Sequence, residues 1–72
     1  MSNPNLVFLT EDVAVVDGDM VECDVAGRTE YLRYFDIDNE YCQFGFKSYR
    51  RDNLKAEMKT RKVTPLRVVQ PQ

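Results

Sequence analysis

The stretch MVECDVAGRTEYLRYFDI, residues 20–37, determines the fold class of the chain. Residues 20–25 alternate between apolar and acidic side chains, and this period of two predicts a strand with one buried face. The tripeptide AGR at positions 26–28 predicts a tight turn. Residues 29–37 are rich in aromatic and β-branched side chains, which favours a second strand. The stretch therefore predicts an antiparallel hairpin.

The segments that precede this hairpin extend it to a meander. Asp17-Gly18 is a strong turn signal, and it joins the hairpin to the apolar run Val13–Val16. This run adds a strand, so residues 13–37 are predicted to form a three-stranded antiparallel meander. A second apolar run, Leu6–Leu9, comes earlier in the chain. We expect the two apolar runs to form one bent strand.

The sequence changes in character after the hairpin. Ser48 is a candidate N-cap for a helix over most of residues 49–62, which are rich in good helix formers. Residues 63–69 predict a final strand, in which Pro65 removes one hydrogen-bond donor and favours a sheet edge or a bulge. The pattern predicts one domain over residues 1–72, of class α+β and mainly β. We expect a truncated OB-like barrel made of the meander, one helix and a final edge strand.

Composition excludes several classes of protein. Apolar residues make up 43% and charged residues 31% of the 72 residues, which is typical of a folded domain. No run is long enough to span a bilayer, and the N-terminus lacks the features of a secretory signal, so we expect a cytoplasmic protein without a membrane partner. The chain contains no histidine, and its cysteines, Cys23 and Cys42, fit no zinc motif. We expect two reduced thiols.

The charges are distributed unevenly along the chain. Residues 1–40 hold ten acidic residues and two arginines, whereas residues 41–72 hold eight basic and two acidic residues. Phosphate backbones attract basic surface, so any nucleic acid should prefer the second half. The alternative is that the two halves attract each other when folded. The candidate nucleic-acid-binding residues lie on the predicted helix and just before it: Lys47, Arg50, Arg51, Lys55, Lys59, Arg61 and Lys62.

Two acidic clusters flank the hairpin. Asp17 and Asp19 lie at the first turn, and Asp36, Asp38 and Glu40 lie where the second strand of the hairpin ends. Carboxylates from two strand ends can converge on a hard cation such as Ca²⁺. The alternative is that DG is an ordinary turn and that the other acidic residues are solvated surface.

Four segments in order resemble the staphylococcal nuclease family: VVDGDMVE, GRTEYLRYFDID, EYCQFGFKSY and LKAEMKTRKVT. The resemblance extends from about Val13 to Val69 and covers the front part of a family domain. It implies an OB-type barrel, a calcium ion and hydrolysis of DNA or RNA phosphodiesters. It also implies roles for individual residues. Asp19, Asp38 and the carbonyl group of Asn39 would bind the metal, Arg33 would neutralise phosphate, and Glu40 would position the attacking water.

The departures from the family pattern bear on function. Met20 replaces a threonine, Asn39-Glu40 replaces T-P-E, and no residue matches the second catalytic arginine. We therefore expect a small nuclease-like module without autonomous activity. Such a module would bind a protein or a second copy through an open sheet edge, or nucleic acid through the basic helix. The alternative is a minimal Ca²⁺-dependent phosphodiesterase completed by dimerisation or by a partner.

A set of aromatic residues is the other candidate surface for a protein partner. Because large aromatic side chains are usually buried, we expect most of them in the core. The set consists of Tyr31, Tyr34, Phe35, Tyr41, Phe44 and Phe46.

Overall fold

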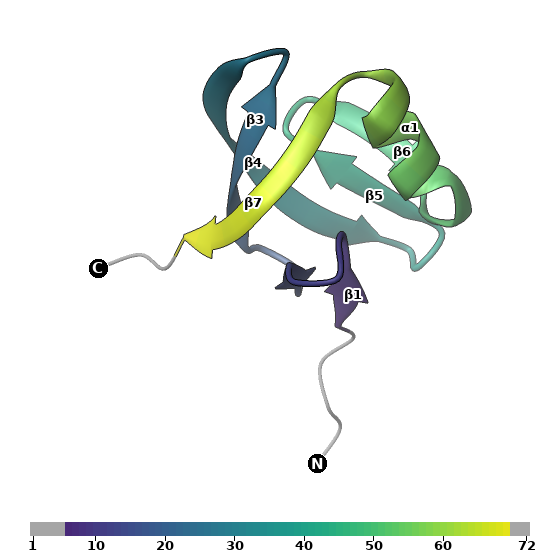
Figure 1. Cartoon of the computed structure of the whole chain (residues 1–72). Coiled ribbons are helices and arrows are strands. Elements are labelled where there is room, and N and C mark those ends of the chain that lie inside the picture. Colours follow the sequence, from purple (N-terminus) through teal and green to yellow (C-terminus); the bar gives the residue numbers. More distant parts are fainter. Residues whose placement is uncertain (1–5, 70–72) are drawn as a thin grey trace.

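The computed structural model describes residues 6–69, which form an α+β fold that is mainly β, as predicted (Figure 1). Five antiparallel strands form one sheet in the order β6-β5-β4-β3-β7, and β1 and β2 form a separate two-stranded sheet. No closed barrel is present among these residues. The elements are β1 (Val7–Phe8), β2 (Ala14–Val15), β3 (Met20–Val25), β4 (Arg28–Ile37), β5 (Tyr41–Phe44), β6 (Lys47–Arg50), a 3₁₀ turn (Arg51–Asn53), α1 (Leu54–Thr60) and β7 (Val63–Val69).

The predicted central hairpin is confirmed. Strands β3 and β4 pair antiparallel, from Met20 opposite Arg33 to Val25 opposite Arg28. Ala26 and Gly27 form the turn with φ angles of 52° and 85°. Two left-handed residues give a turn whose twist matches that of the strands, so the loop closes the hairpin without splaying it.

The two N-terminal runs do not form one bent strand. They pair antiparallel with each other, with Val7 opposite Val15. Thr10 Oγ1 accepts hydrogen bonds from the backbone N–H groups of Asp12 and Val13, at 3.2 and 3.0 Å, and so reverses the chain between them. Because β2 pairs with β1 and not with β3, the predicted meander over residues 13–37 is wrong. The meander consists of β3, β4, β5 and β6.

The predicted helix begins later than Ser48. Residues 41–50 form the hairpin β5–β6 around Gly45 and Phe46, and Tyr49 lies in a strand opposite Cys42. A 3₁₀ turn follows, and α1 begins at Leu54. Cys42 and Tyr49 face the core from adjacent strands, and this burial outweighs the helix propensity of the residues that follow.

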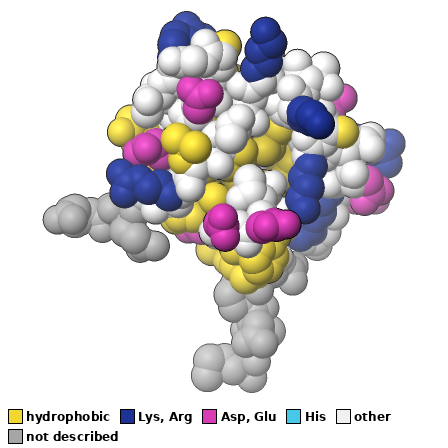
Figure 2. All heavy atoms as spheres, in the orientation of Figure 1, with side chains coloured by type: hydrophobic (Ala, Val, Ile, Leu, Met, Phe, Trp, Pro, Cys, Tyr) yellow, Lys and Arg dark blue, Asp and Glu magenta, His cyan; other side chains and the backbone are white. Residues whose placement is uncertain are grey.

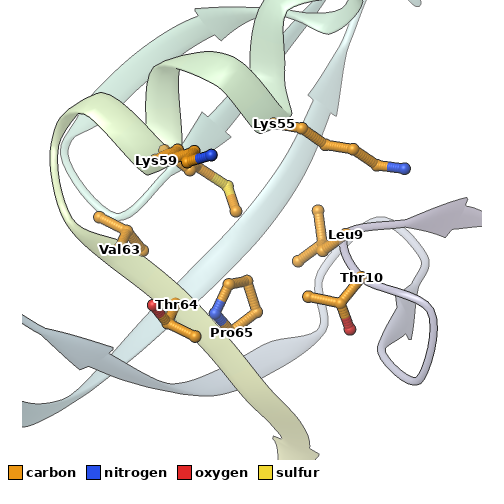
Figure 3. Close-up of a pocket in the computed structure, with 8 residues that line it drawn as sticks. Leu9, Thr10, Lys55, Lys59, Val63, Thr64 and Pro65 are labelled. Carbon is orange, nitrogen blue, oxygen red and sulfur yellow. The ribbon is translucent and has the colours of Figure 1, made fainter.

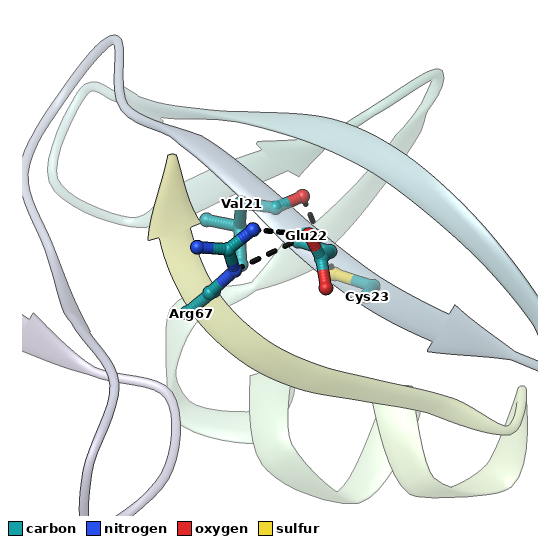
Figure 4. Close-up of polar contacts among 4 residues, drawn as sticks. All are labelled: Val21, Glu22, Cys23 and Arg67. Carbon is teal, nitrogen blue, oxygen red and sulfur yellow. Dashed lines mark hydrogen bonds and ion pairs between the residues drawn. The ribbon is translucent and has the colours of Figure 1, made fainter. Parts of the chain in front are cut away.

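Strand β7 lies at the sheet edge, as the sequence predicted. It pairs only with β3, and its register shifts opposite Glu22 and Cys23, where Pro65 sits. Glu22 Oε1 accepts hydrogen bonds from Nε and Nη2 of Arg67, at 3.2 and 3.0 Å, which join the two strands (Figure 4). Proline has no backbone N–H to donate to a neighbouring strand, and a bulge in an edge strand tolerates this loss.

The core lies between the inner face of the sheet, the helix α1 and the β1–β2 hairpin. Helix α1 contacts both β6 and β7 and buries Leu54 and Met58 (Figure 1). No helix within residues 6–69 has the length and apolar character needed to cross a membrane. The largest side chains that are fully buried are Tyr34, Phe44, Val15, Val21, Cys23 and Cys42.

Both cysteines are free and buried, and burial makes the stability of the fold depend on pH. Desolvation raises the pKa of Cys23 to about 12 and also raises the pKa of Cys42, Tyr34 and Tyr49. A thiol with a raised pKa in the folded state contributes its full stability below the unfolded-state pKa. That contribution is lost as the pH rises toward the folded-state pKa.

We therefore expect the free energy of unfolding to fall as the pH rises above about 9. Cys23 alone should account for a loss on the order of 1 kcal/mol near pH 10. Urea unfolding at about pH 7.5 and about pH 10 measures this loss. The Cys23→Ala variant should show a shallower decline, and equal stability of the wild-type protein at both pH values would contradict the prediction.

Candidate functional site

The first acidic cluster serves as a turn. Asp19 Oδ2 accepts a hydrogen bond from the backbone N–H of Val16 at 2.9 Å. Asp17 Oδ1 accepts one from the backbone N–H of Asp36 at 2.8 Å. Gly18 N–H donates to the carbonyl group of Tyr34 at 2.8 Å, so residues 17–19, which come just before β3, lie along β4. Both carboxylates are thus engaged with the backbone.

Arg33 lies beside this turn. Its Nη1 donates a hydrogen bond to the carbonyl oxygen of Gly18 at 2.8 Å. The structure therefore brings Arg33 next to the segment that carries Asp19. The guanidinium group, however, bonds to a backbone carbonyl oxygen and thereby helps to fix the turn.

Asp38, Asn39 and Glu40 form the exposed turn between β4 and β5. Asp38 and Asn39 have φ angles of 57° and 60°. Glu40 N–H donates to the carbonyl group of Ile37 at 3.4 Å. Asp and Asn tolerate left-handed backbone better than most residues, and this accounts for their presence here. The carbonyl group of Asn39, a predicted metal ligand, accepts a hydrogen bond from Arg51 Nη1 at 3.4 Å.

The residues predicted to bind calcium lie in two separate turns of the described chain, one before β3 and one between β4 and β5. No group of three or more acidic, cysteine or histidine residues converges among residues 6–69. Arg51 bonds to the Asn39 carbonyl group, and a cation there would have to displace it. Calcium binding and the catalytic roles of Arg33 and Glu40 therefore stay predictions.

Sequence reasoning missed a partly buried ion pair on the inner face of the sheet. Arg51 Nη1 lies 3.3 Å from Asp36 Oδ2, and the two side chains are only 28% and 11% exposed. The other carboxylate oxygen of Asp36 and the hydroxyl group of Tyr34 are buried and have no hydrogen-bond partner among residues 6–69. Arg51 thus neutralises a carboxylate of its own chain and is not a free cation for nucleic acid.

The other predicted basic residues divide into two groups. Arg61 pairs with Glu57 at 3.4 Å and lies over the ring of Tyr49, and Arg50 lies 6.0 Å from the ring centroid of Tyr41. The four lysines have no acidic partner within salt-bridge distance among residues 6–69, and we call them the lysine face. Figure 2 shows basic side chains gathered on the side of the molecule where α1 lies. The lysine face consists of Lys47, Lys55, Lys59 and Lys62.

An apolar groove of about 200 Å³ adjoins the lysine face (Figure 3). Leu9 of the N-terminal hairpin, Met58 of α1 and Pro65 of β7 contribute apolar lining. Lys55 and Lys59, one helical turn apart, border it on the helix side. The groove brings together three segments that are distant in the sequence.

The prediction that most aromatic residues of the candidate set lie in the core is wrong. Only Tyr34 and Phe44 are buried. Phe46, at the tip of the β5–β6 turn, is 103% exposed. Tyr31, Phe35 and Tyr41 point to the outer face of the sheet, away from α1, because they alternate with the buried positions.

Comparison of the chain with protein-family models, with curated proteins and with solved structures gives no match.

Proposed function

We propose that this protein is a binding module for nucleic acid, which it contacts through the lysine face, and that it does not hydrolyse nucleic acid on its own. One observation carries the proposal. The four lysines have no acidic partner in the described chain, whereas the acidic residues that a nuclease centre would need bond to the backbone or to arginine, or form an exposed turn. The charges of the two halves therefore do not simply cancel.

The arrangement of the lysines suits a polyanion. Lys55 and Lys59 are i, i+4 neighbours on α1, which puts their stems side by side on the helix surface. Lys62 follows in the turn after the helix, and Lys47 lies at the start of β6, which α1 contacts. Ammonium groups that bind phosphates release counterions, so the binding should weaken steeply with salt.

The relation to the staphylococcal nuclease family is part of the proposal and rests on the resemblance. The proposed fold is a partial OB-like barrel, supported by the meander, the helix and the final edge strand. Loss of catalysis is supported by the hydrogen bonds that engage Arg33 and the Asn39 carbonyl group. A cofactor Ca²⁺ would have to replace these contacts.

The test is the salt dependence of binding to a labelled oligonucleotide of roughly 20 nucleotides, followed by fluorescence anisotropy. If three phosphates are contacted, the affinity for a single strand should fall about twentyfold between about 50 and about 200 mM KCl. Lys55→Gln and Lys59→Gln should each weaken binding and lower the logarithmic salt slope by about 0.7. Arg67→Gln is the matched control, because it removes one exposed positive charge from the outer face of the sheet, away from α1.

Two results would contradict the proposal. An affinity that does not change with salt, or one that Arg67→Gln lowers as much as Lys59→Gln does, would exclude the lysine face and favour a protein partner. Calcium-dependent cleavage of the same oligonucleotide that Asp19→Asn abolishes would instead support the minimal phosphodiesterase.

A further inference from the structure

The outer face of the five-stranded sheet carries a cluster of large exposed side chains. Tyr31 is 58% exposed, Tyr41 is 42%, and Phe35 and Ile37 are each 38% exposed. Helix α1 and the N-terminal hairpin cover the opposite face, so no described element covers this one. We call the cluster the aromatic face, and it consists of Tyr31, Arg33, Phe35, Ile37, Tyr41 and Gln43.

The register of the strands makes the aromatic face continuous. Phe35 lies opposite Gln43, and Ile37 lies opposite Tyr41. Cross-strand partners on one face are about 5 Å apart, and diagonal neighbours such as Phe35 and Tyr41 are within reach of each other. Arg50, on β6, lies over the Tyr41 ring. Contiguous exposed apolar surface of this kind, rich in Tyr, Phe and Arg, marks an interface.

The charges around the aromatic face favour a second copy of the chain as the occupant. Arg33 lies within the face. Arg67 lies beside Tyr31, because both are opposite Glu22, and it forms an ion pair with Glu22 at 3.0 Å, so this end keeps one net positive charge. Asp38 and Glu40 form the acidic turn at the other end, just after Ile37. Arg50, over the Tyr41 ring, offsets one of these charges, so this end keeps one net negative charge. The acidic turn would repel a phosphate backbone. A surface that is basic at one end and acidic at the other complements itself when it is reversed.

We propose that two copies associate through their aromatic faces, related by a two-fold axis that lies between the sheets and crosses β4 near Phe35. In such an isologous contact, a residue a given distance before Phe35 faces one the same distance after it. The acidic turn of each copy then lies near Arg33 and Tyr31 of the other. The sheet edges fit less well, because the bulge at Pro65 interrupts β7 and β6 has only four residues.

The proposed dimer has a consequence for binding. Helix α1 packs on the inner face of the sheet, so a dimer formed through the outer faces leaves both lysine faces exposed, on opposite sides. A dimer with two sites gains avidity for a polyanion that spans them, or bridges two separate strands. Dimerisation itself does not depend on the proposed function and is tested without nucleic acid.

Analytical ultracentrifugation of the protein alone tests the dimer, over a range from about 5 to about 200 µM. The chain has a mass of 8.4 kDa, and we expect twice that mass at the higher concentrations. Phe35→Glu puts two carboxylates next to each other across the axis and should raise the dissociation constant about a hundredfold. Phe46→Glu is the matched control, because Phe46 is fully exposed outside the aromatic face and its change should leave the dimer intact.

A second variant distinguishes a loss of dimerisation from unfolding of the Phe35→Glu protein. Tyr31→Glu lies on the same face at a more exposed position and should also weaken the dimer. Glu40→Lys changes no apolar contact and should weaken it about tenfold, because it turns an attraction to Arg33 into a repulsion. A mass of 8.4 kDa at every concentration would overturn the inference, as would a dimer that neither Phe35→Glu nor Tyr31→Glu weakens.

Discussion

Replacing Tyr34 by alanine should lower the free energy of unfolding by about 3 to 5 kcal/mol. Tyr34 is completely buried, and it lies in β4 at the point where the strand changes partners. Arg33 is the last residue of β4 opposite β3, and Tyr34 is the first opposite β5. Its side chain therefore packs within both halves of the sheet. A domain of this size is expected to have only about 4 to 10 kcal/mol of stability, so the loss would remove between about a third and all of it.

Tyr34→Phe separates packing from hydrogen bonding at the same site. The hydroxyl group of Tyr34 is buried and has no hydrogen-bond partner in the described part of the chain, so its removal should change stability by less than about 1 kcal/mol. Urea unfolding followed by circular dichroism measures both variants, with Phe46→Ala as the exposed control. If Tyr34→Phe is as destabilising as Tyr34→Ala, then the hydroxyl group and not the packing of the ring stabilises the fold.

Replacing Arg51 by methionine should lower the free energy of unfolding by about 2 to 3 kcal/mol. The carboxylate of Asp36 is 11% exposed, and one of its oxygens is already without a partner. Removal of Arg51 leaves this carboxylate partly buried without a counter-charge, and an unpaired buried charge is costly. The cost is less than for a fully buried pair, because Arg51 is 28% exposed and water reaches it.

The double variant Asp36→Asn with Arg51→Met should recover most of the stability that Arg51→Met loses, because no uncompensated charge remains. Additive losses in this double-mutant cycle would show that the two side chains do not interact. The Arg51→Met variant should also keep the wild-type salt slope for nucleic acid, although the sequence placed Arg51 among the candidate binding residues. A salt slope lowered as much as in Lys59→Gln would show that Arg51 contributes to nucleic-acid binding.

Local sequence determined the hairpins and turns whose paired residues are close together in the chain. The alternation in residues 20–25 and the turn at Ala26-Gly27 determined the central hairpin, because its pairing depends only on neighbours in the chain. Pro65 indicated an edge strand, because proline lacks the backbone N–H that a central strand needs. Thr10, whose hydroxyl group accepts the hydrogen bonds that reverse the chain between β1 and β2, was also a sequence signal for this hairpin. The apolar runs on either side of Thr10 suggested one continuous strand instead.

Only the tertiary structure decided what the charged and aromatic residues do. Asp17 and Asp36 each bond to a group that is distant in the sequence, so their spacing along the chain does not reveal whether they bind a metal or stabilise the fold. The aromatic residues of β4 and β5 alternate between core and solvent. Which alternate set is buried depends on the side of the sheet that α1 and the N-terminal hairpin cover. That choice is made by packing between segments distant in the sequence, because burial is a property of the assembled surface and not of the residue.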